Sequence, residues 1–162
     1  KSSDAFLRAM KLKSHKLQQD GTESKALKDK VDVKYIKYLR SGVMMKKYCS
    51  SAKPRKRLVK LTDNLEHILL IDPNGKKAPK QIYVRFITEL RTGACTYTLR
   101  RSGLGWKKAK EERCFAIFTE DKSGFKNDIN LECKTVEIYE KWTNALLQLI
   151  EYAHEKSKIN YT

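Results

Sequence analysis

The spacing of apolar residues changes twice along this chain of 162 residues. Over residues 1–40, apolar side chains recur every three or four positions with lysines opposite them, which predicts basic amphipathic helices broken near Gly21. From Ser41 the period falls to two, which is typical of half-buried strands. From Thr135 to Tyr152 a wide apolar stripe returns at helical spacing, with Thr135 as its N-cap. The pattern predicts a helical extension, a sheet and one long C-terminal helix.

Turn signals divide the central region into six or seven strands. The strongest is the run Asp72-Pro73-Asn74-Gly75, in which Asn-Gly tolerates positive φ. Residues 94–112 are polar and predict a long loop with room for a short helix. A C-terminal helix can close the open end of a bent antiparallel sheet, which makes an α+β fold. The predicted strands are Val43–Tyr48, Arg57–Thr62, His67–Ile71, Gln81–Leu90, Arg113–Thr119 and Asp128–Cys133.

Positive charge is concentrated in one part of the chain. The net charge is +16, and residues 41–60 hold seven Lys or Arg and no Asp or Glu. These cations lie on two predicted strands and the loop between them. Because two strands and their loop can direct several cations at one small volume, the pattern predicts a site for a dense anion such as a phosphate.

Other chemistries find little support in the sequence. The four cysteines are scattered singly, without the CxxC spacing of a zinc or redox site, so neither a metal nor a cofactor is predicted. Neither a P-loop nor a G-x-S-x-G or HExxH motif occurs, so we expect a binding protein with no catalytic residues. Nucleic acid stays an alternative because the charge permits it. We do not expect it, since the strand aromatics follow core periodicity.

The order of elements and several short motifs resemble a pleckstrin-homology domain over about residues 32–153. The resemblance is closest to the domain that opens phosphoinositide-specific phospholipase C. It implies a bent antiparallel sandwich or barrel of about seven strands, capped by the C-terminal helix. The residues that carry it are Gly42–Lys47, Arg57–Leu61, Ile87–Gly93, Arg113–Phe118, Ile129–Lys134 and Trp142.

The resemblance also implies where an acidic headgroup would bind, at the open end of the sheet between the first two strands. Lys47 matches the first lysine of the family's motif, and Arg55 and Arg57 match its basic-x-Arg pair. Cys49 stands where the motif has a second basic residue, a departure that should weaken recognition of multiply phosphorylated inositol. The full set of expected lipid-binding residues is Lys47, Lys53, Arg55, Arg57, Lys76 and Lys77.

A helical segment of residues 1–40, one domain over 41–153 and a short tail over 154–162 resemble the acylated pleckstrin-homology proteins of apicomplexan parasites. That likeness implies phosphatidic acid as the ligand and an acyl anchor upstream of Lys1. It also implies a peripheral position on the cytosolic face of a membrane and a role in exocytosis of secretory organelles called micronemes. Two alternatives stay open: a phosphoinositide-binding module of a phospholipase C-like protein, and a protein partner for residues 1–40.

Overall fold

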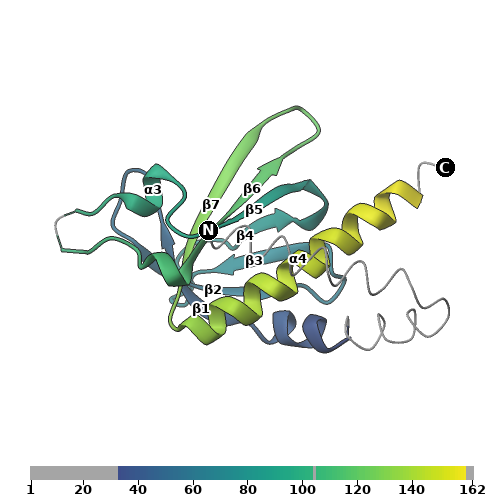
Figure 1. Ribbon diagram of the computed structural model, residues 1–162, viewed down its shortest axis with the longest axis horizontal. Coiled ribbons are helices and arrows are strands. Elements are labelled where there is room, and N and C mark those ends of the chain that lie inside the picture. Colours follow the sequence, from purple (N-terminus) through teal and green to yellow (C-terminus); the bar gives the residue numbers. More distant parts are fainter. Residues whose placement is uncertain (1–32, 104, 160–162) are drawn as a thin grey trace.

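The computed structural model describes residues 33–103 and 105–159, and the helices predicted over residues 1–32 lie outside them. Its main feature is one bent antiparallel sheet of seven strands, crossed by the long helix α4 (Val136–Ile159) as Figure 1 shows. The predicted fold class is confirmed. The strands are β1 (Val43–Tyr48), β2 (Arg55–Leu61), β3 (His67–Ile71), β4 (Lys80–Tyr83), β5 (Ile87–Thr92), β6 (Cys114–Glu120) and β7 (Lys126–Cys133), in the order β4-β3-β2-β1-β7-β6-β5.

Inward-facing residues of the strands form the core against α4. Trp142 of that helix and Leu39, in a helix that spans residues 33–41, are each only 1% exposed. The predicted cap is confirmed, because the Ile138 backbone N–H donates to Thr135 Oγ1 at 3.1 Å. The C-terminal helix continues to Ile159, well beyond the predicted end at Tyr152.

The prediction of one long strand over residues 81–90 was wrong. A 3₁₀ turn, η1 (Val84–Phe86), separates β4 from β5 and takes the chain from one edge of the sheet to the other. Ile82 and Val84 are buried as the alternation predicts, but the turn shifts the phase so that Ile87 is the next core residue. Period-two spacing across the turn therefore looked like one continuous strand.

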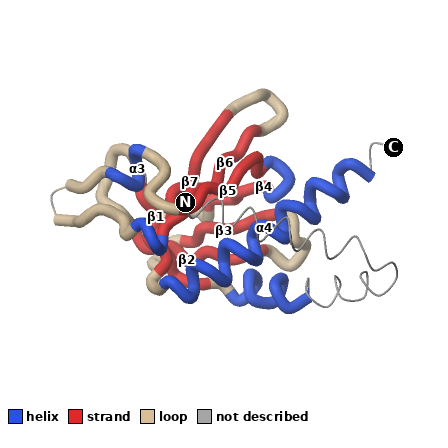
Figure 2. Tube along the Cα trace, in the orientation of Figure 1, coloured by secondary structure: helices blue, strands red, loops and turns tan. Residues whose placement is uncertain are grey.

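Residues 94–103 and 105–113, which we call the 94–113 segment, form a second layer on the outer face of the sheet. They contain the short helix α3 (Tyr97–Arg100) and the 3₁₀ turn η2 (Glu111–Arg113), which confirms the predicted loop with a short helix. Figure 2 shows α3 and its flanking loops beside β1. Leu99 and Ala109 of this segment pack on Tyr48, Cys114 and Ala116 of the sheet in a separate apolar cluster.

Candidate anion-binding site

The ends of β1 and β2 place three cations on the inner face of the sheet. Lys47 is in register with Arg55, and Met45 is in register with Arg57. Met45 is buried in the core. Because side chains two positions apart share a face of a strand, Lys47 follows Met45 on the inner face, just beyond the core. The two strands thus direct their terminal cations into the open end of the sheet, which we call its mouth.

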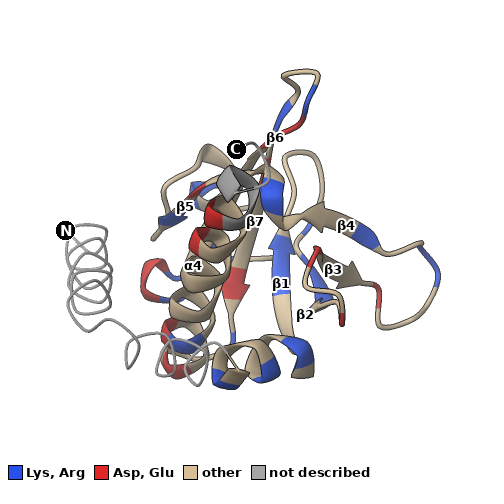
Figure 3. Cartoon of the chain, turned by 90° about the vertical axis from the view of Figure 1, so that its right-hand side faces the viewer, with Lys and Arg blue, Asp and Glu red and all other residues tan. Residues whose placement is uncertain are grey.

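Two further cations join this group from the next hairpin. Burial lowers the pKa of Lys47 below its usual range, and the nearby positive charge of Lys80 lowers it further. Arg57 and Lys77 act in the same direction. We call four of these five cations, Lys47, Arg57, Lys77 and Lys80, the mouth cluster; the fifth, Arg55, is exposed beside it. In Figure 3 the blue segments on β1, on β4 and in the turn between β3 and β4 lie on one side of the domain, and several acidic residues mark α4 on the other.

One carboxylate, Asp72, accompanies the mouth cluster. Its Oδ1 lies 3.9 Å from Arg57 Nη1 and accepts a hydrogen bond of 3.0 Å from the Asn74 backbone N–H. The Asn74 N–H and the Arg57 charge lower the pKa of Asp72, so it is ionised at neutral pH. Asp72 therefore offsets part of the positive charge of the mouth cluster, which stays net positive.

The six residues predicted for the site lie in the mouth cluster, at exposed positions beside it, or on the rim. Lys47, Arg57 and Lys77 belong to the mouth cluster, and Arg55 lies opposite Lys47 on β2 with an exposed side chain. Lys76 is exposed in the β3–β4 turn. The ammonium group of Lys53 is adjacent to Gly105, so this residue lies on the rim beside the 94–113 segment.

Lys80 was not predicted as part of the site. It opens β4, two positions before Ile82, a core residue, and therefore points to the inner face. The sequence did contain a sign of this position, because Lys80 and Ile82 are two residues apart and so lie on the same face of a strand. A strand of only four residues gives too short an alternation to place its first member with that signal alone.

The loop that follows Lys47 is held from the outer face. Arg101 Nη1 donates to the carbonyl of Cys49 at 3.0 Å and also to the carbonyl of Ser50. The Arg101 guanidinium in turn lies over the Trp106 ring, 5.5 Å from its centroid. Trp106 is packed within its own segment and supports the arginine that clamps the β1–β2 loop.

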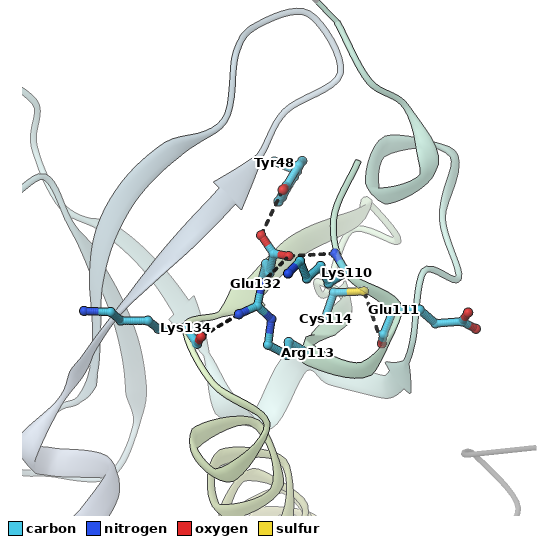
Figure 4. A network of polar contacts seen from close by, with 7 residues as sticks. All are labelled: Tyr48, Lys110, Glu111, Arg113, Cys114, Glu132 and Lys134. Carbon is cyan, nitrogen blue, oxygen red and sulfur yellow. Dashed lines mark hydrogen bonds and ion pairs between the residues drawn. The ribbon is translucent and has the colours of Figure 1, made fainter. Parts of the chain in front are cut away.

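A buried carboxylate fastens the 94–113 segment to the sheet, as Figure 4 shows. Glu132 of β7 is 5% exposed, accepts hydrogen bonds from the Tyr48 hydroxyl at 3.0 Å and the Lys110 backbone N–H at 2.6 Å, and pairs with Arg113 at 3.6 Å. Burial, followed by the Glu132 charge, raises the pKa of Tyr48. This hydroxyl therefore stays protonated and fixes the end of β1 from the side opposite Lys47.

Comparison with known proteins agrees with the fold. A family model described as "Pleckstrin homology domain" matches residues 31–151, which is most of the chain. The chain belongs to the pleckstrin-homology family. No curated protein matches it.

Solved structures show the same fold at low sequence identity. The PH domain from TgAPH is 14% identical with a TM-score of 0.53, and the match covers 77% of this chain and 93% of that one. Inner Membrane Complex Sub-compartment Protein 1 from Toxoplasma gondii is 16% identical with a TM-score of 0.54, over 75% and 92%. PLC21 from S. officinalis is 11% identical with a TM-score of 0.53, and the match covers 69% of this chain. The match spans only 15% of the length of PLC21.

Among residues 33–103 and 105–159, we find no helix with the length and apolar character needed to cross a bilayer. Within the same ranges, no group of three or more His, Cys, Asp or Glu side chains is arranged to hold a metal ion.

Proposed function

We propose that this protein binds an acidic phospholipid headgroup, phosphatidic acid, at the mouth cluster and thereby docks on a membrane surface. The observation that carries the proposal is the convergence of Lys47, Arg57, Lys77 and Lys80 from three strands and a turn. Burial first, and then the like charges of Lys80, Arg57 and Lys77, lower the pKa of Lys47, and an anion bound among these cations would oppose the effect of their charges. Each exposed basic residue near an anionic bilayer contributes about 1 kcal/mol, so the cluster is adequate for recruitment.

Phosphatidic acid suits the composition of this site better than a phosphoinositide. Its phosphomonoester is compact, with a charge between about −1 and −2 near neutral pH by analogy with other phosphomonoesters. Neighbouring ammonium groups favour the doubly charged form. Cys49 contributes no cation where the family motif has one, whereas Lys80 contributes one from β4. The result is a small group of cations around one phosphate rather than a wide slot for several.

Vesicle sedimentation tests the headgroup proposal. We expect the full chain to sediment with phosphatidylcholine vesicles that contain phosphatidic acid and not with phosphatidylcholine alone. A triple variant in which Lys47, Arg55 and Arg57 become Glu should lose this binding. Equal sedimentation with both vesicle types, or an unaffected triple variant, would contradict the proposal. Strong competition by soluble inositol phosphates would favour the phosphoinositide alternative, and tighter, salt-dependent binding to RNA would favour nucleic acid.

We further propose, from the resemblance to acylated parasite proteins, that an acyl anchor upstream of Lys1 acts with the domain on the cytosolic face of micronemes and supports their exocytosis. One acyl chain alone holds a protein only marginally at a membrane, so a second signal from the domain is physically reasonable. Mass spectrometry of the native N-terminus tests the anchor. Conditional depletion followed by a microneme secretion assay tests the role, and normal secretion after depletion would contradict it.

The domain boundaries are likewise a proposal. The sequence predicts a domain over residues 41–153, with residues 1–40 and 154–162 outside it. Leu39 lies in the core, so we propose that the folded unit also includes the helix at residues 33–41. A fragment that begins at residue 41 should then unfold at a lower temperature than one that begins at residue 33.

A further inference from the structure

The hairpin of β6 and β7 extends past the end of the neighbouring strand β1. The last pair of β1 with β7 joins Tyr48 to Asn130, whereas β6 and β7 stay paired as far as Glu120 and Lys126. At about 3.3 Å per residue, the extra length carries the tip roughly 13 Å beyond the β1 end. Figure 1 shows this hairpin projecting from the rest of the domain.

The tip displays an aromatic side chain on a well-fixed turn. Phe125 is 66% exposed. The Asp121 carboxylate accepts hydrogen bonds from the Ser123 and Phe125 backbone N–H groups at 2.9 and 3.0 Å, and Gly124 adopts a φ of +84°. A turn held by its own hydrogen bonds does not need Phe125 for its shape. The Phe125 ring is thus exposed to solvent and contributes little to the stability of the fold.

Phe125 also lies beside the mouth cluster. A hollow of about 260 Å³ opens between β4 and the β6–β7 hairpin, and its lining includes Lys80, Ile82, Phe86, Phe125 and Ile129. Lys80 belongs at once to this hollow and to the mouth cluster. A flat membrane that brings phosphates to Lys80 therefore also meets the exposed ring. The exposed lysines Lys122 and Lys126 are balanced at the tip by the exposed carboxylates Glu120, Asp121 and Asp128, so the apolar ring and not net charge distinguishes this contact.

We propose that Phe125 inserts into the acyl-chain boundary of the bilayer whose phosphates occupy the mouth cluster, so that the β6–β7 tip is a second, apolar membrane contact. The inference rests on the proposed lipid-binding function and assigns the hairpin a role that the cations alone do not predict. Transfer of a phenylalanine ring from water to hydrocarbon is favourable. The contact should therefore strengthen binding to a bilayer and leave binding to a soluble headgroup unchanged.

Single substitutions in the full chain separate these two effects. Phe125→Ser removes the ring, Phe125→Leu keeps an apolar side chain, and Tyr97→Ser is the matched control. Tyr97 is an aromatic residue, 75% exposed, on α3 over the outer face. The probes are phosphatidylcholine vesicles with phosphatidic acid, and monomeric dihexanoyl phosphatidic acid. Because both aromatic residues are exposed, the melting temperatures of all variants should match that of the unsubstituted chain.

We expect Phe125→Ser to bind the vesicles about tenfold more weakly, with unchanged affinity for the monomeric lipid. Phe125→Leu should retain most of the vesicle affinity, and Tyr97→Ser all of it. Vesicle binding by Phe125→Ser at the original affinity would overturn the inference. A parallel loss with the monomeric lipid would also overturn it, by placing Phe125 in the headgroup site. If the unsubstituted chain binds no anionic vesicle, the proposed function fails, and this inference fails with it.

Discussion

Replacing Lys47 by Gln tests whether the mouth cluster serves to bind a ligand or to stabilise the fold. The side chain is partly buried, and burial together with the charges of Lys80 and Arg57 lowers its pKa in the folded protein. The charged form is therefore less favourable in the folded state than in the unfolded chain. This destabilisation is present at neutral pH and disappears as the pH rises through the lowered pKa toward the unfolded value.

Two opposite effects of Lys47→Gln follow. Loss of one cation facing the bilayer removes about 1 kcal/mol of attraction, which weakens affinity for vesicles with phosphatidic acid about fivefold. Loss of a repelled charge leaves the melting temperature the same or raises it. A residue that served only to stabilise the fold would behave in the opposite way, with a lower melting temperature and unchanged binding.

Lys46→Gln is the matched control. Lys46 is the preceding residue of β1, carries the same charge and is exposed on the outer face, where its register partners are Lys56 and Glu132. We expect a change in vesicle affinity of less than about twofold, because the outer face points away from the mouth. Vesicle sedimentation and thermal unfolding of both variants give the answer. Equal losses of affinity for Lys46→Gln and Lys47→Gln would show that only overall charge matters and would refute the site.

Three other outcomes are expected. Glu132→Gln removes the charge that pairs with the partly buried Arg113, so urea unfolding should show a loss of about 3 kcal/mol, and a loss below 1 kcal/mol would mean that the network is not cooperative. Arg101→Gln releases the β1–β2 loop, so amide exchange there should speed up with a loss of about 1–2 kcal/mol, and unchanged exchange would contradict the clamp. Cys114 and Cys133, whose pKa values burial raises to about 12, should resist alkylation at pH 8 until the protein unfolds, as mass spectrometry can check.

Periodicity was sufficient for the strands with one buried face, such as β3, whereas β6 and β7 carry runs of consecutive buried residues. The bounds of β1 and β3 agree with the prediction, although only β3 alternates cleanly, because Met45 and Tyr48 of β1 are buried on opposite faces. The error at Val84–Phe86 has a physical cause: a single 3₁₀ turn changes the phase while leaving buried residues on both sides. Local spacing cannot distinguish that turn from a continuous strand.

The site was only partly accessible to sequence reasoning, for a different reason. Lys47 and Arg57 lie in a local motif, whereas Lys80 reaches the cluster only because β3 and β4 pair. The contact of Arg101 with Cys49 joins residues that are 52 positions apart. Both contacts join segments that are distant in the sequence, so the neighbours of Lys80 and Arg101 become visible only once the chain is folded.

The outer-face layer explains how the mouth cluster can persist without a ligand. Four cations in one mouth repel each other, so the strands that carry them must be held by contacts elsewhere. Glu132 holds Tyr48, the residue next to Lys47, and Arg101 holds the carbonyls that follow it. Both contacts act on the end of β1 from the side that faces away from the ligand. Because the loop is already ordered, little of the binding free energy is lost in ordering it, and even a modest number of cations can then recruit the protein to a membrane.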